Sequence, residues 1–398
     1  MKRTMMTLLL SRFESISLLL LFCLTICFCS KKQDSLYERI DHKGARLTQK
    51  IEGLLADTIY CPASMTSMSG QWILRDSELV FLDKYAVGIK HFSLDGKFLK
   101  ENVKKGRGPG EVTAPAWISF WDSSQGQLIV HDKNCAIQLF ARDDSLIFDL
   151  QGPWFSRMDE KYDPELWKER ALTPDLSHPQ IYDYNYECRR IVFSSGYLYI
   201  PVIAEHPKLN GYDKHAGSRK YWKEAGLFIS FVPDSILETS KLIGRYPPIY
   251  VKQNIPVFST YDFFIKDNLI HVSFAADPNI YVLDLEGYPV HCYGEREKGI
   301  SSNYPETKTF EEYERVYKSQ REKHGYYGRL IDVGDYSFRT CYLDSGEWLL
   351  QVYKDYDLVR VLECGSEINV LGEQDGWYYA DAGGDFKNER FVIVKFKL

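Results

Sequence analysis

Short apolar runs separated by turn residues dominate the chain after residue 56. Two of them align, "ELVFLDKYAVGIKHFSLDGKFL" at 78–99 and "QLIVHDKNCAIQLFARDDSLI" at 127–147. Each contains an apolar strand, Asp-Lys, an apolar pair, Phe and an Asp-containing turn before a further strand. Asp83 stands 49 residues before Asp132, close to the roughly 40–50-residue period of propeller blades. The pattern predicts an all-β fold built from repeated blades.

Later apolar runs are looser copies of the same unit. They are "GYLYIPV" at 196–202, "NLIHVSF" at 268–274, "FRTCYL" at 338–343 and "GWYYAD" at 376–381. With the first two runs they make six copies of the repeat unit, which we call stations, so we expect a six-bladed β-propeller over 57–398. We also expect "DTIYCPAS" (57–64) to pair with "RFVIVKFKL" (390–398), because closing the ring removes exposed strand edges.

Two polar insertions interrupt the repeat, at about 151–187 and 303–325. The second predicts one helix, since Thr309 and Glu312 fit a capping box and Gly325 is placed to end it. We interpret this helix as packed on a sheet edge rather than as a partner-binding element. The first insertion predicts a helix near 164–170.

The N-terminal segment has the pattern of a secretory signal. Positive residues precede the apolar segment Ile16–Phe28, which is shorter than the roughly 20 residues that span a bilayer. Cys29 stands at the apolar-to-polar border and resembles the lipid-attachment cysteine of bacterial lipoproteins, although Phe28 replaces the usual small residue. Simple cleavage or an uncleaved anchor are the alternatives. We therefore expect a signal peptide at 1–28 and a tether at 29–56, with a helix-like stretch at 47–55, leading to a lipid-anchored protein of the bacterial cell envelope, periplasmic or at the outer membrane.

The chain resembles a family of uncharacterised six-bladed β-propeller lipoproteins from Bacteroidetes-type bacteria. The resemblance rests on the lipoprotein-like start, "GRGPGEV" at 106–112, "QLIVHDKNCAIQLF" at 127–140 and the late helix followed by "YSFRTCYL". The family is a domain of unknown function with blades similar to the NHL or TolB kind. It implies the fold and a location in the envelope, and it implies no catalytic residue.

The window "KKGRGPGEV" at 104–112 invites a phosphate-binding interpretation, which its details exclude. A P-loop needs Gly-Lys-Ser/Thr before a helix, and here a strand-like segment follows. Gly106, Gly108 and Gly110 around Pro109 instead favour a tight turn that joins two blades. Arg107 and Glu111 are placed either to pair with each other or to bond exposed backbone groups.

Composition narrows the function classes further. The net charge of −6 argues against a nucleic-acid partner. The histidines lack metal-ligand spacing, and no nucleotide motif or nucleophile elbow occurs, so we expect no metal, no cofactor and no catalytic residue readable from sequence. The six cysteines after Cys29 are scattered without C-x-x-C. An oxidising compartment would permit disulfides, but we interpret most of these cysteines as small buried residues of strands.

Aromatic residues in polar segments are the strongest indication of a binding site. The candidates for ligand binding are Trp154, Trp167, Tyr182, Tyr184, Tyr212 and Trp222. Exposed rings of this kind stack on sugars or peptide side chains, although they could also fold over the propeller as packing. We therefore expect a non-catalytic binding or interaction module that uses one propeller face, with a glycan or envelope protein as partner. The alternative is a carbohydrate-active hydrolase or lyase with carboxylates in the central funnel.

Overall fold

The computed structural model describes residues 36–37, 40–64, 66–132, 136–151, 175–177, 181–185, 187–204, 209, 211 and 218–398. The chain divides into two compact units, 1–41 and 42–398, and the two-residue strand β1 (Asp41–His42) stands at their junction. The expected helix near 164–170, Cys29, Trp154, Trp167 and Tyr212 lie outside the described residues.

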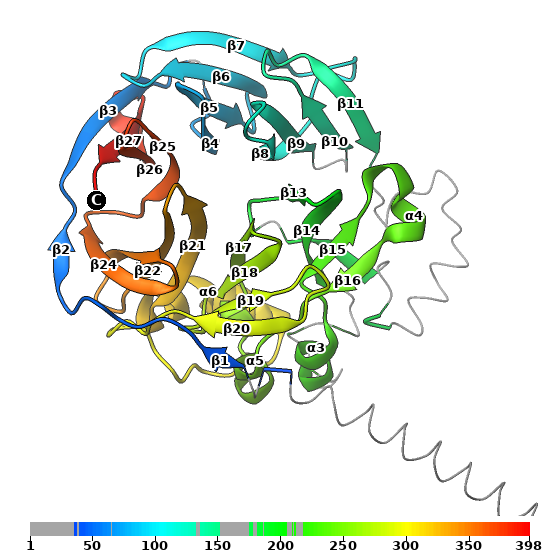
Figure 1. Ribbon diagram of the computed structural model, residues 1–398, viewed down its shortest axis with the longest axis vertical. Helices are drawn as coiled ribbons and strands as arrows, with labels where there is room; N and C mark the ends of the chain where they lie inside the picture. The colour runs from blue at the N-terminus through cyan, green and yellow to red at the C-terminus, as the bar shows by residue number, and fades with distance from the viewer. Residues whose placement is uncertain are drawn as a thin grey trace, which may run out of the picture. The chain divides into compact units, whose positions relative to one another are not determined.

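The second unit is a ring of six antiparallel sheets, a six-bladed β-propeller as the repeat predicted (Figure 1). Blade 1 comprises β4 (Gly70–Arg75), β5 (Glu78–Asp83), β6 (Gly88–Ser93) and β7 (Phe98–Lys104). Blade 2 comprises β8 (Pro115–Asp122), β9 (Gln127–Asp132), β10 (Ala136–Phe140) and β11 (Leu146–Gln151). Blade 3 comprises β13 (Val192–Ser194), β14 (Tyr197–Ala204), β15 (Phe228–Phe231) and β16 (Lys241–Ile243), with β12 (Tyr182–Tyr184) added beside β14.

The second half of the ring repeats the same order. Blade 4 comprises β17 (Tyr261–Lys266), β18 (Leu269–Phe274), β19 (Ile280–Leu283) and β20 (Pro289–Tyr293). Blade 5 comprises β21 (Tyr326–Val333), β22 (Tyr336–Tyr342), β23 (Trp348–Lys354) and β24 (Asp357–Cys364). Blade 6 comprises β25 (Asn369–Gln374), β26 (Trp377–Asp385), β27 (Arg390–Phe396) and the N-terminal strand β3 (Ala56–Pro62).

The six sequence stations correspond to the same position in every blade. They fall on β5, β9, β14, β18, β22 and β26, the second strand of each sheet. Asp83 and Asp132 are the last residues of β5 and β9. The second strand is buried on both faces between its neighbours, so its apolar run is the least interrupted part of the repeat.

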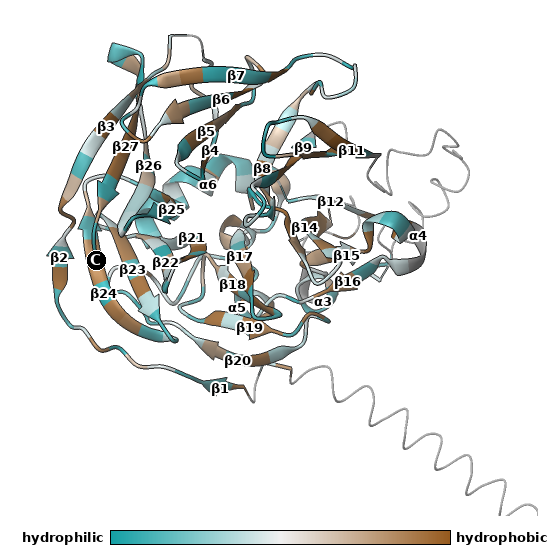
Figure 2. Cartoon of the chain, turned by 45° about the horizontal axis from the view of Figure 1, so that its top comes forward, coloured by the Kyte–Doolittle hydropathy of each residue, from teal (hydrophilic) through white to brown (hydrophobic). Residues whose placement is uncertain are grey.

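Ring closure follows the prediction. β3 pairs antiparallel with β27, with Ile59 opposite Ile393, so blade 6 takes its outermost strand from the N-terminal side of the chain. In the cluster between blades 6 and 1, Trp72 packs edge-on against Phe391 with ring centroids 5.0 Å apart. Figure 2 shows the corresponding apolar stretches in brown along the strands.

The segment before β3 is extended, which corrects the helix-like interpretation of 47–55. Residues 42–55, which we call the strap, run along the outer strands, and β2 (Ile51–Gly53) pairs in parallel with β24. Leu47 N–H donates to Leu358 O, and Leu54 N–H donates to Glu363 O. The outer strand of blade 5 leaves backbone groups unpaired, and an extended strap satisfies them where a helix could not.

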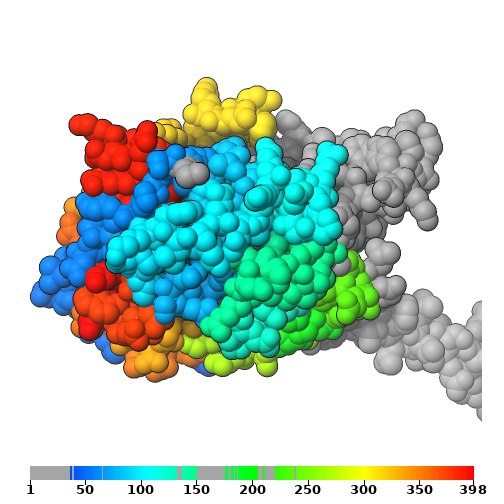
Figure 3. Space-filling model, turned by 90° about the horizontal axis from the view of Figure 1, so that it is seen from above, coloured from blue at the N-terminus to red at the C-terminus, as the bar shows by residue number. Residues whose placement is uncertain are grey.

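The expected helix is α6 (Phe310–His324). Thr309 is its N-cap and accepts a hydrogen bond from Glu312 N–H, and Gly325 ends it with a φ of 63°. None of its residues is buried. Its main packing partner is the 3-10 helix η4 (Pro256–Phe258), so the expected position on a sheet edge is corrected. Figure 3 shows the yellow segment that carries α6 standing out beyond the blades on one face of the ring, which we call the α6 face.

Shorter helices connect the later blades. They are α3 (Ser218–Glu224), η3 (Pro233–Ser235), α4 (Ile236–Thr239), α5 (Pro248–Gln253) and η5 (Phe386–Asn388). Cys61, Cys188, Cys292, Cys341 and Cys364 are all buried and unpaired. Four of them lie in strands, as interpreted from the sequence, and Cys188 lies in the loop before β13.

The glycine-rich window forms the joint between blades 1 and 2, as predicted. It connects β7, the outermost strand of blade 1, to β8, the innermost strand of blade 2. Glu111 accepts a hydrogen bond from Gly108 N–H at 2.8 Å. Gly110 has a φ of 77°, and a Cβ at Gly106 would lie 1.8 Å from Glu111 Oε2, so a larger residue there would displace the Glu111 side chain.

Candidate functional site

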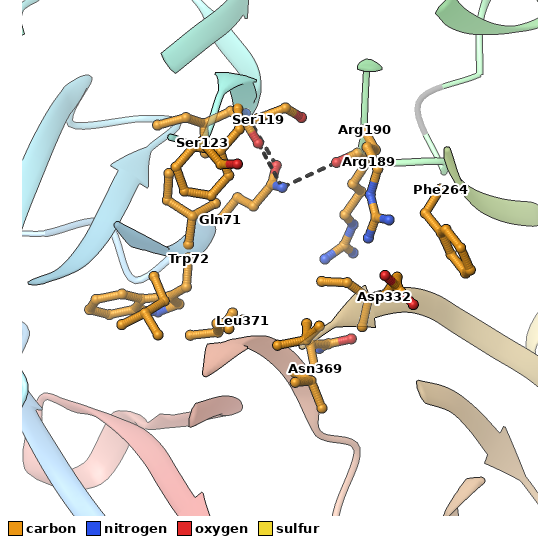
Figure 4. A pocket seen from close by; sticks show the side chains of 18 of the residues that line it. Gln71, Trp72, Ser119, Ser123, Arg189, Arg190, Phe264, Asp332, Asn369 and Leu371 are labelled. Atoms are coloured by element: carbon orange, nitrogen blue, oxygen red, sulfur yellow. Dashed lines mark hydrogen bonds between the residues drawn. The ribbon is translucent and has the colours of Figure 1, made fainter. Parts of the chain in front are cut away.

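A cavity of about 640 Å³ runs through the centre of the ring. The innermost strand of every blade contributes to its wall, namely β4, β8, β13, β17, β21 and β25. We call this cavity the channel. Its wall combines amides, hydroxyls, aromatic rings and charged side chains, and Figure 4 shows how they converge.

Arginines gather where the innermost strands begin. Arg189 and Arg190 precede β13, and Arg329 lies near the start of β21. We call these three residues the arginine mouth. Figure 4 shows the side chains of Arg189 and Arg190 directed into the channel. Helix α6 lies close to this mouth, since Tyr317 Oη donates to the carboxylate of Glu187, two residues before Arg189.

Asp262, a buried residue of β17, holds two of the arginines in place. Its Oδ2 lies 3.7 Å from Arg190 Nη2 and 3.7 Å from Arg329 Nη1. The same oxygen accepts a hydrogen bond from Leu330 N–H at 3.1 Å, which links blade 4 to blade 5. Arg190 also donates to Phe263 O at 2.8 Å. The side chain of Arg190 is therefore held in the wall of the channel by Phe263 O and Asp262.

A bulge in β21 places Arg329 at the mouth. The register with β22 shifts between Tyr327 and Leu330, and Arg329 N–H donates to Thr340 Oγ1 at 2.7 Å instead of to a strand carbonyl. Gly328 allows this approach, because a Cβ at that position would lie 2.5 Å from Thr340 Oγ1. β-bulges commonly re-aim a side chain next to a functional site.

Arg189 is the most accessible of the three. Its side chain is exposed within the channel, while its backbone carbonyl accepts a hydrogen bond from Gln71 Nε2 at 3.1 Å. The guanidinium of Arg329 lowers the pKa of Arg189, and desolvation adds to this effect. Two like charges thus share the mouth, and neither guanidinium has a hydrogen-bond acceptor within the part of the chain that the structure describes.

One carboxylate beside the mouth has an altered acidity. Asp381, opposite Asn369 in the sheet of blade 6, has its pKa raised to about 6 by burial. Glu367 raises this pKa as well, whereas the charges of Arg189 and Arg329 lower it. The Gly383 N–H donates to Asp381 at 2.9 Å.

The opposite end of the channel carries the reverse charge. Asp76, Asp332 and Glu373 lie where β4, β21 and β25 end. Each already has a partner, respectively Arg142, Lys266 and Gly376 N–H. Near this end Trp121 stacks on Phe193, with ring centroids 3.6 Å apart and planes 10° apart. The charged side chains that line this end are thus carboxylates with partners, whereas arginines line the other end.

The aromatic candidates from the sequence occupy other places. Tyr182, Tyr184 and Trp222 are each only 1% exposed, so the expectation that these rings are exposed is wrong. Tyr182 Oη donates to Leu176 O, Trp222 Nε1 donates to Asn254 Oδ1, and Tyr184 packs edge-on against Trp117. The polar sequence around these rings therefore belongs to a local core, in which the polar tips of Tyr182 and Trp222 are hydrogen-bonded.

The sequence reasoning missed the arginine mouth. The signal was the dipeptide Arg189-Arg190 directly before an apolar strand, an unusual place for two adjacent charges. Arg329 lies far away in the chain and joins them only through the ring.

Other chemistry is not seen in the described part of the chain. No group of three or more His, Cys, Asp or Glu side chains there could hold a metal ion. Burial raises the pKa of the thiols of Cys61, Cys341 and Cys364 to about 12, which leaves them unreactive. Among those residues no helix has the length and apolar character that crossing a bilayer requires.

Comparison with known proteins supports the fold. No known protein family matches the chain by sequence, and no curated protein matches it. A crystal structure of a DUF4221 family member from Bacteroides vulgatus matches with a TM-score of 0.64 at 14% identity, over 88% of this chain and 99% of that one. A protein from Bacteroides fragilis whose name describes it as exported matches with a TM-score of 0.51 at 13% identity, over 90% of this chain and 98% of that one. The resemblance to uncharacterised six-bladed propellers of such bacteria is thus confirmed at the level of the fold, which this chain shares along nearly their whole length.

Proposed function

We propose that this protein is a non-catalytic binding module of the bacterial cell envelope and that its ligand occupies the channel. The observation that carries the proposal is the set of unsatisfied polar groups in the channel wall. Asn369 Oδ1 is buried there without a hydrogen-bond partner among the described residues, and the guanidinium donors of Arg189 and Arg329 face solvent. Buried polar atoms in proteins are nearly always paired, so Asn369 Oδ1 marks a place for a ligand or water, and the guanidinium donors in the same channel offer that ligand further hydrogen bonds.

The chemistry of the wall favours binding over hydrolysis. The carboxylates at the far end are engaged by Arg142, Lys266 and a backbone N–H, which leaves them poor candidates for proton transfer. The arginines at the other end recognise oxyanions and hold permanent charges. A glycan or an envelope protein with a group that enters the channel fits this arrangement.

The location in the envelope rests on the N-terminal sequence and on the exported relative. Ile16–Phe28 has the length of a secretory apolar segment, and Cys29 stands where a lipid would be attached. Mass spectrometry of the mature N-terminus tests this part. A diacylated Cys29 is the expected result, and an unacylated N-terminus at another residue contradicts the lipid anchor.

Filling the channel tests the binding function. The variant Asn369→Trp places a large ring in the wall of blade 6, and Tyr85→Trp adds the same ring at a turn of blade 1 that is 69% exposed and outside the channel. The full chain and both variants are screened on glycan arrays. Loss of a binding signal in Asn369→Trp with retention in Tyr85→Trp supports the channel as the site. A signal unchanged in both variants places binding elsewhere and contradicts the proposal.

A further inference from the structure

We infer that the arginine mouth is an oxyanion site, and that Arg189 and Arg329 together bind the carboxylate or phosphate group of a small anionic ligand in the channel. This inference rests on the proposed binding function and names the chemical class of its ligand. It assigns separate tasks to the arginines: Arg189 and Arg329 contact the ligand, whereas Arg190 and Asp262 position the mouth.

The division of tasks follows from the hydrogen bonds. Arg190 already donates to Phe263 O at 2.8 Å. Arg329 has only the 3.7 Å approach to Asp262, longer than a hydrogen bond, and Arg189 has no ion pair within 4 Å among the described residues. Each guanidinium carries five N–H donors in a planar fork that matches carboxylate and phosphate. Both residues line the channel, and their charges lie close enough to affect each other, so one ligand can reach the donors of both.

Electrostatics favours an anion at this position. Arg189 and Arg329 repel each other, which is why the pKa of Arg189 is lowered. An oxyanion between them replaces repulsion by two charge-assisted contacts, the strongest class of hydrogen bond at a protein surface. The carboxylates of Glu367, Asp381 and Asp262 offset part of this positive charge, yet the lowering of the Arg189 pKa by Arg329 and desolvation outweighs them.

The rest of the channel limits what the anion can belong to. A volume of about 640 Å³ suits a small molecule or the end of a chain. The charged residues that line the far end, Asp76, Asp332 and Glu373, are carboxylates and would not hold a second negative group, so the ligand carries its charge at one end. The stacked pair Trp121 and Phe193 offers an apolar surface for the uncharged part.

The test uses the full chain and three probes: glucuronate, its neutral counterpart glucose, and inorganic phosphate. The variants are Arg189→Gln with Arg329→Gln, the same pair changed to Lys, and Arg360→Gln as a control on the outer edge of blade 5, where Arg360 is 3.6 Å from Glu52. Calorimetric titration gives the affinity, and thermal unfolding without ligand confirms that each variant is folded.

The expected result is that an anionic probe binds and glucose does not. The double Gln variant then loses roughly tenfold or more in affinity, and Arg360→Gln loses nothing. The double Lys variant separates the two sources of oxyanion. The double Lys variant keeps its affinity for phosphate, because a lysine ammonium binds phosphate as a point charge. It loses affinity for glucuronate, because the carboxylate is bound by the two parallel N–H groups of an arginine.

Failure of the inference differs from failure of the proposed function. If the double Gln variant binds the anionic probes as well as the unaltered chain, or if neither anion binds, the oxyanion site is refuted. A neutral glycan that still binds and is blocked by Asn369→Trp would leave the binding function standing. If Asn369→Trp binds the glycan as well as the unaltered chain does, the proposed binding function of the channel is refuted.

Discussion

Asp144, in the turn between β10 and β11, accepts a hydrogen bond at 2.7 Å from Nη1 of Arg75, the last residue of β4. A turn of blade 2 thus reaches into blade 1. His91 Nε2 lies 2.8 Å from the second carboxylate oxygen of Asp144. The side chains of Arg75 and Asp144 are only 3% and 1% exposed, so this ion pair is buried.

Asp144→Asn is expected to lower the free energy of unfolding by about 3–5 kcal/mol, because it leaves the buried charge of Arg75 without its counterion. Chemical denaturation measures the change. The matched control is Arg142→Gln, which breaks the exposed pair with Asp76 and should cost at most about 1 kcal/mol. Equal losses in the two variants would show that the buried pair has no special role in joining the blades.

Stability is expected to fall on acidification, with His271 responsible for part of the loss. Burial, together with the smaller effects of the neighbouring His291 and Lys266, lowers the pKa of His271 to about 3. The unfolded chain therefore binds a proton near pH 6.5 that the folded chain refuses until about pH 3. The free energy of unfolding therefore decreases as the pH is lowered from about 6.5 to about 3. His271→Gln should flatten the pH dependence of the denaturation midpoint between pH 6 and 4, and an unchanged slope would contradict this assignment.

The affinity for an anionic probe is expected to rise as pH falls through about 6. Protonation of Asp381 removes a negative charge that competes for Arg189 and Arg329, while Glu367 and the thiol of Cys61 also lie within its field. Asp381→Asn should bind glucuronate with the acid-form affinity at every pH from 5 to 7. Titrations at pH 5, 6 and 7 test this, and a variant that keeps the pH dependence would exclude Asp381 as its source.

Gly106→Ala is expected to destabilise the joint between blades 1 and 2. The added Cβ would meet Glu111 Oε2 at 1.8 Å and displace the carboxylate from Gly108 N–H. The loss of that charge-assisted hydrogen bond suggests a cost of roughly 1–3 kcal/mol. Gly53→Ala is the control, because nothing lies within 4 Å of the Cβ position there. Denaturation curves that shift equally for both variants would contradict the packing role of Gly106.

The repeat was predictable because the second strand of every blade is buried in the same way between its two neighbours, so the same apolar pattern recurs six times. Asp83 and Asp132 end equivalent strands, and the same apolar run precedes each. The arginine mouth was not predictable, because its charges meet only after the ring has closed. The spacing of Asp262, Arg190 and Arg329 along the chain does not indicate that the carboxylate lies 3.7 Å from both arginines in the folded ring. The aromatic candidates failed for a different reason: Trp222 lies in a polar segment, yet its indole N–H bonds Asn254 in a local core.

The strap gives the propeller a mechanical path for tension. A pull applied at residue 42 first meets the hydrogen bonds of His42 to Gly294 O and of Lys43 to Cys292 O on blade 4. It then meets the contacts of Leu47 and Leu54 with blade 5. Only after these have parted does the force reach β3, the strand that closes the ring. The hydrogen bonds of the strap to blades 4 and 5 therefore break first, and they protect the pairing of β3 with β27 that closes blade 6.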